Sequence, residues 1–540
     1  RQLLILEAGF QNPPNQAKAR TWWHWISGNV SKSGITKDLE AMKQIGIQET
    51  QLFNVHLGFP QGPVKYLSKE WLDLLKFSAE EAKRLDLELA FHNSAGWSSS
   101  GGPWVTPEHA MQTVVFSELN IEGGTLFKSE IPRPETKIDY YKDIAVLAFP
   151  KPKQSIRIDG LDYKMLSERI RNHLLPDKKV ISTDAIIQKE AIINLTSKLS
   201  EDGVLEWNVP KGDWVVLRLG HTPIGTTNRP APPEAKGLEV DKMSKKAVDA
   251  YWEAGVQPII NKLGDLIGTT VNNCIIDSYE VETQNWTTGF DTQFENLRGY
   301  DLTSYLPTLA GYYVDSGEVS ERFLWDFRRT IGDLIAENYY GHFGELCHKN
   351  NLNFSVEPYW GPFDNMQVGA KGDIVMCEFW SGGYPFFDSS KFVSSIAHLN
   401  GSRIVGAEAF TGIGGWDKHP ATIKSIGDKA WAEGITRFIF HTYVHQPWDV
   451  APGLALSYHG FDFNRLNTWW TQSKSHLDYI AKSQFLLQQG NNVADVLYFT
   501  GDSSPNTAFL LPELKTLGYD YDMIGANKLA ELSVKNGKIV

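Results

Sequence analysis

Two apolar runs of strand length end in carboxylates, and these carboxylates suggest the chemistry. The run CIIDSYEVETQNWT (274–287) delivers Asp277 and Glu280, and the run SRIVGAEAFT (402–411) delivers Glu408. A carboxylate at the end of a buried strand is costly to desolvate, so it needs a partner or a function. Two such strands in one α/β protein indicate a pair of carboxylates facing each other across a cleft. Cleavage of a glycosidic bond requires one protonated and one ionised carboxyl in that arrangement.

Other glutamates compete for these roles. Glu357 and Glu378 also lie at the ends of apolar runs, and Glu282 follows Glu280 by two residues, which makes it the second candidate for the acid. Surplus carboxylates in a sugar-binding site hold hydroxyls or a hard cation, and Ca²⁺ takes several oxygen ligands. The sequence has no EF-hand loop. Some of these glutamates are expected to have only structural partners.

Histidines also follow several apolar runs. They are interpreted either as hydroxyl-binding groups of a cleft or as core residues bonded to the backbone. The Gly/Ser-rich stretch 91–104, with Asn93, is interpreted either as a substrate-lining loop or as an ordinary turn. The sequence contains no HExxH zinc motif, no GxSxG elbow and no dinucleotide fingerprint. The histidines concerned are His24, His56, His92, His441 and His445.

Eight apolar runs recur along the chain with helical patterns between them. Continuous apolar runs are typical of parallel strands that are covered on both faces. Eight β/α units predict a (β/α)8 barrel, in which the carboxyl ends of the strands carry the site. The runs are 20–29, 50–58, 87–97, 271–281, 353–361, 373–383, 402–411 and 435–448.

The helical patterns between the runs have apolar residues at helical spacing. One connection, 362–372, is too short and too rich in glycine for a full helix, so we expect one degenerate unit. One predicted helix follows Ser33. The others cover 69–85, 244–267, 320–349, 388–399, 420–433 and 464–487.

One connection is much longer than the others and alternates like a β-sheet. Residues 112–240 contain short strand patterns separated by turn residues, which predict an inserted β-sandwich-like domain. Its Pro-rich stretch 229–237 is interpreted as an exit linker, and its role as either carbohydrate contact or a cleft rim. The barrel is then formed by 1–111 and 241–488. Residues 489–540 are expected to begin a further α/β domain that continues beyond this chain.

Composition limits the possible partners. The 540 residues are too many for one ordinary domain, and the net charge of −12 argues against a nucleic-acid partner. No apolar stretch is long enough to span a membrane. Cys274, Cys347 and Cys377 lie in apolar contexts and are expected to be free thiols. The chain lacks a signal peptide and does not begin with Met, which we interpret as processing or trimming.

Five longer motifs resemble one enzyme family. The stretches 20–47, 91–111, 237–244, 277–287 and 406–411 together resemble glycoside hydrolase family 106, the α-L-rhamnosidases, from about residue 10 to the end. The resemblance implies an inverting enzyme of bacteria that degrade pectin or other rhamnose-bearing glycans. It also implies a periplasmic, secreted or cell-surface location.

The resemblance also implies roles for individual residues. Glu280 would be the general acid and Glu408 the general base, although Val281-Glu282 departs from the smaller residues expected there and keeps Glu282 as an alternative. A bound calcium would contact sugar hydroxyls, with Glu378 as a ligand. His56, His92, Asn93, Glu357 and His441 would bind the hydroxyls of rhamnose. The 6-deoxy methyl group requires an apolar wall, for which the candidates are Trp25, Trp97, Trp360, Trp380 and Trp416.

Two other interpretations remain open. A retaining β-glycosidase of the barrel superfamily also uses glutamates after strands four and seven, but usually with Asn before the first, where this chain has Tyr279. A carbohydrate-binding protein without catalysis is the second. Both Glu280 and Glu408 are present, which argues against that reading.

Overall fold

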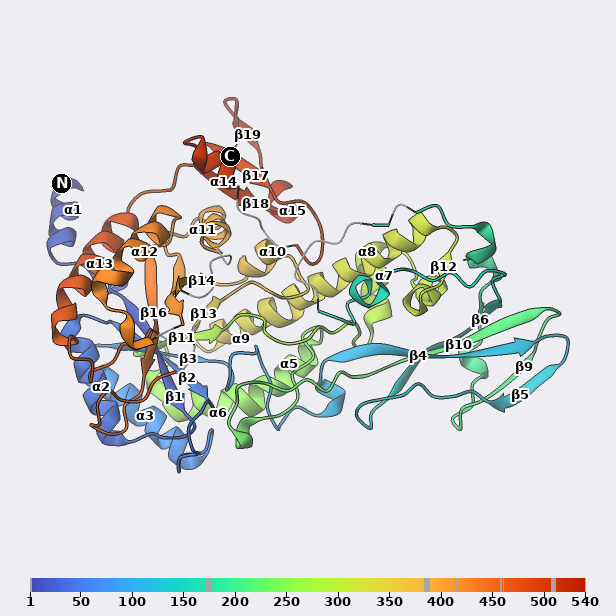
Figure 1. Cartoon of the computed structure of the whole chain (residues 1–540), viewed down its shortest axis with the longest axis horizontal. Coiled ribbons are helices and arrows are strands. Elements are labelled where there is room, and N and C mark those ends of the chain that lie inside the picture. Colours follow the sequence, from blue (N-terminus) through green and yellow to red (C-terminus); the bar gives the residue numbers. More distant parts are fainter. Residues whose placement is uncertain are drawn as a thin grey trace.

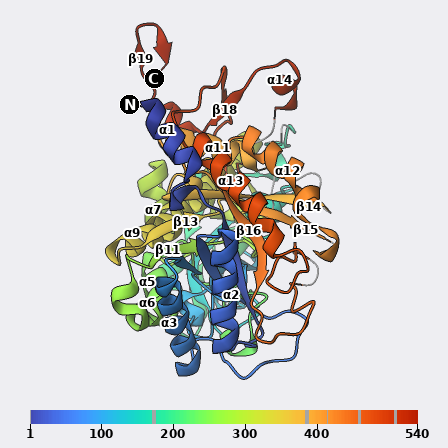
Figure 2. The same cartoon turned by 90° about the vertical axis from the view of Figure 1, so that its left-hand side faces the viewer.

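The computed structural model describes residues 2–169, 176–177, 179–382, 389–413, 415–456, 459, 461–506 and 511–539. A closed barrel of parallel strands, in the order β1–β16–β15–β14–β13–β11–β3–β2, lies on the left in Figure 1 and is turned toward the viewer in Figure 2. The predicted barrel is therefore confirmed, and each of the eight apolar runs supplies one strand; residue 383, the end of one run, lies outside the described residues. The strands are β1 (Arg20–Ile26), β2 (Glu49–Val55), β3 (Glu88–His92), β11 (Val271–Ile276), β13 (Asn353–Val356), β14 (Ile374–Gly382), β15 (Gly406–Gly412) and β16 (Arg437–Val444).

Amphipathic helices cover the outside of the barrel. The first of them shows how the sequence fixes the two ends of a helix. The side chain of Ser31 accepts a hydrogen bond from the Gly34 N–H, and Gly46, with φ of 101°, ends the helix in the left-handed conformation. The degenerate unit is confirmed as the five-residue α10. The helices that follow the strands are α2 (Lys32–Ile45), α3 (Lys69–Arg84), α5 (Lys245–Tyr251), α6 (Gln257–Leu263), α8 (Gly317–Leu334), α9 (His342–Lys349), α10 (Asn365–Gly369), α11 (Ser390–Leu399), α12 (Pro420–Ala432) and α13 (Lys474–Leu487).

Two of these helical connections contain π-helical turns. Trp252–Val256 separates α5 from α6, and Ile335–Gly341 separates α8 from α9. A π turn shifts the register of the side chains that follow it and occurs frequently near functional sites. Here the Tyr339 hydroxyl donates to the Ser99 carbonyl (3.0 Å), and the Tyr251 hydroxyl donates to the Asn93 carbonyl (2.6 Å). The helices therefore hold the loop after β3.

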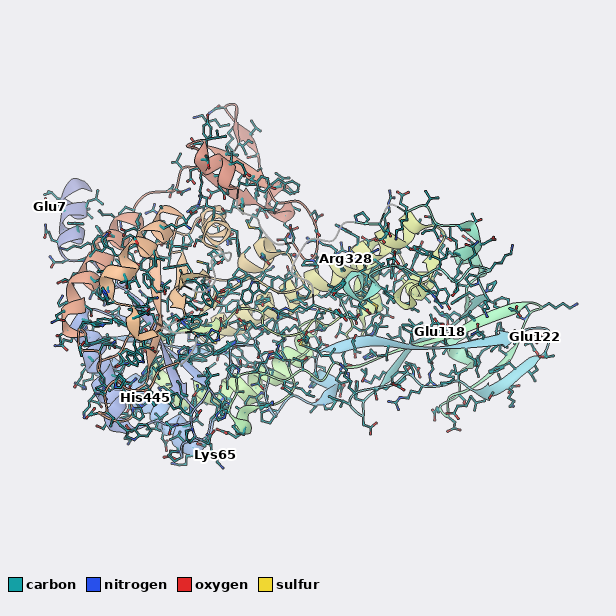
Figure 3. The ribbon with its side chains drawn as sticks, viewed as in Figure 1. Glu7, Lys65, Glu118, Glu122, Arg328 and His445 are labelled. Atoms are coloured by element: carbon teal, nitrogen blue, oxygen red, sulfur yellow. The ribbon has the colours of Figure 1, made fainter. Side chains whose placement is uncertain are left out.

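The long connection after β3 is rich in strands, as expected. Four strands form an antiparallel sheet in the order β4–β10–β6–β8, and β5 pairs with β9. Trp207, Trp214 and their neighbours form a core between them. Figure 3 places Glu122 of β4 at the opposite end of the molecule from His445. The division into domains stays a prediction. The strands are β4 (Gln112–Glu122), β5 (Leu126–Glu130), β6 (Lys142–Pro150), β8 (Ile193–Asn194), β9 (Val204–Asn208) and β10 (Asp213–Pro223).

The last part of the chain packs against α11. Strands β17 (Val496–Phe499) and β18 (Tyr521–Ile524) are parallel neighbours, with α14 (Pro512–Thr516) between them in sequence. The Lys391 ammonium on α11 pairs with Asp520 at 2.7 Å. Among the described residues, no helix combines the length and the apolar character needed to cross a membrane. The remaining elements are α1 (Gln2–Gln11), α4 (Leu161–Lys164), β7 (Ile186–Ile187), α7 (Phe290–Arg298), β12 (Tyr313–Val314), α15 (Ala526–Leu529), β19 (Val534–Lys535) and β20 (Lys538–Ile539).

Candidate active site

Four consecutive barrel strands bring carboxylates to one side of the barrel mouth. Asp277 follows β11 and Glu357 follows β13, and the last residues of these strands, Ile276 and Val356, are register partners. Glu378 of β14 and Glu408 of β15 are also register partners. Neighbouring parallel strands in register present their side chains to the same side, so carboxylates that are far apart in the sequence lie close together at this edge.

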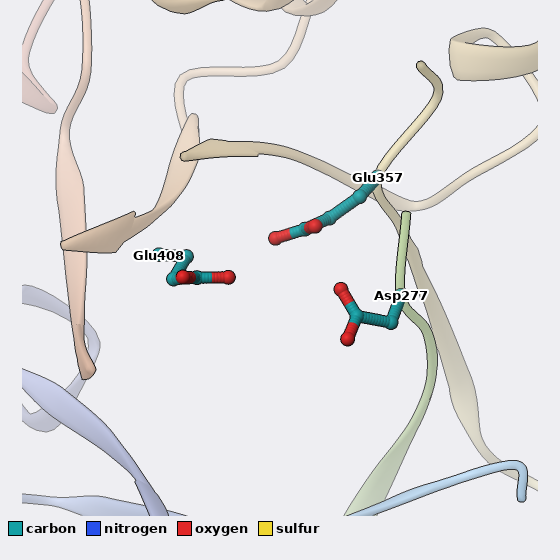
Figure 4. Close-up of side chains that lie close together, drawn as sticks. All are labelled: Asp277, Glu357 and Glu408. Atoms are coloured by element: carbon teal, nitrogen blue, oxygen red, sulfur yellow. The ribbon is translucent and has the colours of Figure 1, made fainter. Parts of the chain in front are cut away.

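Three of these carboxylates form a tight cluster. Asp277, Glu357 and Glu408 each contribute one oxygen, and these oxygens all lie within 4.8 Å of one another (Figure 4). All three side chains are buried. The Tyr359 hydroxyl donates to Oε2 of Glu357 at 2.5 Å, and the Tyr279 N–H donates to the Tyr359 carbonyl at 3.2 Å. The ends of β11 and β13 are therefore fixed to each other.

The pKa values of the buried carboxyls are raised. Burial, with a smaller contribution from the charge of Glu280, raises the pKa of Asp277 to about 7, although the hydrogen bond with Glu357 acts the other way. Burial and repulsion by Asp277 and Glu408 raise the pKa of Glu357. Burial also raises the pKa of Glu378, together with the charges of Glu280 and Asp277. Without a counter-ion, such a cluster retains protons at neutral pH.

The cluster has the chemistry of a site for a hard cation. Calcium binds carboxylate oxygens at about 2.3–2.6 Å, so two ligand oxygens on one ion are at most about 5 Å apart. The 4.8 Å limit of the Asp277, Glu357 and Glu408 oxygens meets this condition. When both Glu357 and Asp277 are ionised, Oε1 of Glu357 has no hydrogen-bond donor in the described part of the chain. A cation would satisfy that oxygen.

Glu408 has its own set of contacts. The Thr411 hydroxyl donates to Oε1 of Glu408, and Nε2 of His441 lies 3.7 Å from the same oxygen. Burial lowers the pKa of His441 to about 3, so the imidazole is neutral at physiological pH. Burial, followed by the charges of Glu378 and Asp277, raises the pKa of Glu408. Glu408 is thus a buried carboxylate that no cationic histidine neutralises.

Glu280 lies on the loop after β11, at the edge of the cluster. It is half-buried, and its Oε1 accepts from the Ser278 hydroxyl at 3.0 Å. Its backbone is held on both sides, because its N–H donates to the Ser98 carbonyl (3.0 Å) and its carbonyl accepts from Nη2 of Arg229 (3.2 Å). Glu282 is exposed and pairs with Arg229 at 3.7 Å. Of the two residues that the sequence predicts as candidates for the acid, Glu280 is therefore the more firmly anchored.

A fully buried ion pair supports this backbone anchor. The Glu239 carboxylate accepts from Nζ of Lys242 at 2.9 Å, from the Ser98 hydroxyl at 2.6 Å, and from the N–H and hydroxyl of Ser100 at 3.1 and 2.9 Å. Both charged side chains have no exposed surface. Glu239 therefore fixes the loop whose Ser98 carbonyl binds the Glu280 N–H. Glu239 lies in the motif 237–244, but no pattern in the sequence predicts its role.

Three predicted substrate-binding side chains gather around a residue that the sequence did not single out. The rings of Trp97 and Trp380 lie 6.1 and 6.5 Å from that of His459. The charge of His459 also acts on His441. The Trp97 and Trp380 side chains are only half-buried, so they can offer apolar surface to a ligand. Only the fold reveals His459, because it lies in a connection without a recognisable motif.

Trp360 and Trp416 lie on the segments that follow β13 and β15. Trp360 is half-buried, contacts Tyr359 with ring centroids 5.6 Å apart, and has a φ of 71°. A bulky residue in this left-handed conformation is uncommon and marks a constrained backbone. Trp416 is 42% exposed in the turn after β15. Their roles in substrate binding stay predictions, as does calcium binding by Glu378.

The structure does not bring Trp25 to the cleft. Its side chain is only 1% exposed and packs with Trp23 and Trp71 in the layer between the barrel and its helices. Trp22, by contrast, belongs to a separate cluster inside the barrel. Successive side chains of a strand point to opposite faces, so Trp25 and Trp22 diverge.

The other predicted hydroxyl-binding residues lie inside or at the rim of the barrel. His92 stacks on Phe53 with ring centroids 3.7 Å apart, and burial lowers its pKa to about 3. Asn93 donates to the Ser99 carbonyl at 2.8 Å and so helps to shape the loop. His56 is half-buried directly after β2. The sequence placed Asp277 at a strand end but predicted no role for it, and the structure places its carboxylate in the cluster with Glu357 and Glu408.

Comparison with known proteins identifies the family of the chain. The model of the glycoside hydrolase 106 family, described as α-L-rhamnosidase, matches residues 11–540. The chain belongs to this family. A rhamnosidase from Novosphingobium sp. PP1Y has a similar structure, with a TM-score of 0.85 and 32% identity over 99% of this chain and 66% of that one.

A curated relative is more similar in sequence but has a different name. The "Putative beta-glucuronidase" of Formosa agariphila is 78% identical over 534 residues, which cover 99% of this chain and 46% of that protein. The chain thus spans about half the length of the curated relative it matches. Family membership and the rhamnosidase neighbour support glycosidase activity.

Proposed function

We propose that this chain forms the catalytic part of an inverting α-L-rhamnosidase that removes terminal α-L-rhamnose from a polysaccharide or oligosaccharide. The observation that carries the proposal is the convergence of Asp277, Glu280, Glu357, Glu378 and Glu408 from four neighbouring strands, in a chain of the α-L-rhamnosidase family. The similarity to a rhamnosidase structure supports the sugar specificity.

In the proposed reaction the two glutamates act on opposite sides of the scissile bond. Glu280 donates its proton to the glycosidic oxygen as the bond to the anomeric carbon breaks. Glu408 takes a proton from a water molecule whose oxygen bonds to the anomeric carbon from the other face, so that β-L-rhamnose is released. The raised pKa of Glu408 makes it a stronger base once ionised. The neutral His441 beside it does not offset that basicity.

We further propose that Asp277 and Glu357, with Glu378 on the next strand, hold a calcium ion. When bound, it would supply positive charge that binds sugar hydroxyls and favours ionised carboxylates. Asp277 and Glu357 already act electrostatically on each other and on Glu378. Glu408, with one oxygen in the same cluster, would be kept ionised as the base.

The apolar part of the substrate-binding wall is proposed from side chains that remain partly accessible. Trp97 and Trp380 supply half-buried indole surface for the 6-deoxy methyl group of rhamnose. His441 and the cluster itself supply partners for hydroxyls. Trp25 is left out because its ring is buried among helices.

Hydrolysis of an aryl α-L-rhamnoside by the full-length protein, followed by proton NMR of the first sugar released, tests the proposal. We expect β-rhamnose first, and loss of turnover with retained rhamnose binding in Glu408→Gln. Early α-rhamnose would instead make one glutamate a nucleophile, as in a retaining enzyme. An aryl β-D-glucuronide assayed in parallel tests the activity named for the 78% identical relative; cleavage of that compound alone would refute rhamnosidase activity.

A further inference from the structure

A groove lies where the strand-rich part after β3 meets the loop that carries Glu280. It has a volume of about 610 Å³, within the range of small-molecule sites. Its walls come from β4, the end of β10, the segments around Thr136 and Ser167, and the β11 loop at Glu282 and Thr283. Segments distant in sequence thus form one concave surface beside the proposed acid.

The groove is firmly joined to the acid-bearing loop. Glu282 and Glu280 are two residues apart, so their Cα atoms are at most about 7.6 Å from each other. Nη2 of Arg169, a lining residue, donates to the Tyr279 carbonyl at 2.8 Å. The Asn285 side chain accepts from the N–H of Val114 on β4 at 2.7 Å. The groove therefore cannot move away from Glu280 without breaking these bonds.

The lining has the chemistry of a site for sugar hydroxyls. Hydroxyl side chains both donate and accept hydrogen bonds, as sugar hydroxyls do. Three acidic and two basic side chains also line it, and one of the acidic ones, Glu282, pairs with Arg229 at 3.7 Å, so the lining offers no excess of positive charge for a sugar that carries a carboxylate. The hydroxyl residues are Thr113, Thr136, Ser167, Thr222, Thr226 and Thr283; the charged ones are Glu135, Lys137, Glu168, Arg169 and Glu282.

We propose that this groove binds the uncharged sugar residues on the leaving-group side of the scissile bond. The proposal rests on the function proposed above, because the leaving group lies on the side of the general acid that protonates its oxygen. Binding energy from this remote part of the substrate then orients the glycosidic oxygen toward Glu280. The strand-rich part would thereby select the glycan, while the barrel selects the terminal sugar.

Two bulky substitutions test the groove in the full-length protein. Thr136→Trp and Ser167→Trp each add an indole to a groove wall outside the proposed catalytic residues. Ser129→Trp is the matched control, because Ser129 is an exposed hydroxyl residue of β5 that does not line the groove. The substrates are 4-nitrophenyl α-L-rhamnoside, which has no second sugar, and a trisaccharide with terminal α-L-rhamnose on two neutral hexoses.

For the trisaccharide we expect each groove variant to lose at least tenfold in kcat/KM, mainly through KM. For the aryl rhamnoside the same variants should stay within twofold of wild type, and Ser129→Trp should match wild type on both substrates. The inference is overturned if the groove variants lose activity equally toward both substrates or toward neither. It is also overturned if the wild type cleaves only the aryl compound. A wild type that cleaves neither rhamnoside would instead refute the proposed function.

Discussion

Glu239→Gln should separate the positioning of the acid from the rest of catalysis. The substitution keeps the size of the side chain but removes the charge that faces Lys242 at 2.9 Å in a fully buried pair. It also weakens the bonds to Ser98 and Ser100, and Ser98 is the residue whose carbonyl holds the Glu280 N–H at 3.0 Å. The proposed acid would then lose a fixed backbone position.

The expected losses of stability and of kcat follow from the broken ion pair and from the displaced acid. Removing the charge of one partner of a buried ion pair lowers the free energy of unfolding by about 3–5 kcal/mol. General acid catalysis contributes roughly 10²–10⁴-fold, and a displacement of about 1 Å can cost on the order of 10²-fold. We therefore expect kcat to fall by about 10–100-fold for a substrate whose leaving group needs the proton. The fall should be within about threefold for a leaving group that departs without it, since that step bypasses the acid.

The assay compares phenyl α-L-rhamnoside, which needs protonation, with 2,4-dinitrophenyl α-L-rhamnoside, which does not. Turnover of both substrates is measured well below the melting temperature of each variant, which is determined by circular dichroism. Glu321→Gln is the control, because it breaks another buried Lys–Glu pair, with Lys164, that joins α4 to α8. Glu280→Gln shows the leaving-group dependence expected when the acid itself is lost.

Equal losses of Glu239→Gln on the two substrates would refute the reasoning, because a general loss of folded enzyme affects both alike. The same selectivity in Glu321→Gln would refute it as well. If Glu280→Gln shows no dependence on the leaving group, the assignment of the acid is wrong, and the role of Glu239 falls with it.

Three further predictions concern stability and metal binding. Asp38→Asn should lower the free energy of unfolding by about 3–5 kcal/mol, because the buried Asp38 carboxylate pairs with Arg465 at 2.9 Å; a urea midpoint equal to wild type would contradict this. The raised pKa of Asp277, about 7 against an ordinary value of about 3.9, means that the folded, calcium-free protein binds more protons than the unfolded chain between about pH 4 and 7. Stability should therefore fall as pH rises through that window, and added calcium or Asp277→Asn should reduce the loss; melting temperatures from pH 5 to 8 that rise without calcium would oppose it. Ser31→Ala should cost about 1 kcal/mol through loss of the helix cap to Gly34, measured by the same melts, with Ser129→Ala as a neutral control.

Sequence alone was enough to predict the barrel and the strand ends that carry the buried carboxylates. Apolar runs of the length of strands alternate with amphipathic helical patterns, and this local information is written into consecutive residues. Runs ending at Glu357, Glu378 and Glu408 therefore predicted carboxylates at the barrel mouth, and each lies there. The short fifth helix, α10, was also predictable, because its connection is too short and too rich in glycine.

The tertiary structure decided which of these side chains meet. Every residue of β1 is buried, so the sequence gives no alternation from which to distinguish Trp22 inside the barrel from Trp25 against the helices. Only strand register brings Asp277 within 4.8 Å of Glu357 and Glu408. Glu239 likewise acquires its role from a loop more than a hundred residues earlier in the chain. Hydrophobic patterning is local along the chain, whereas register, packing and the pairing of buried charges arise only when distant segments close against one another.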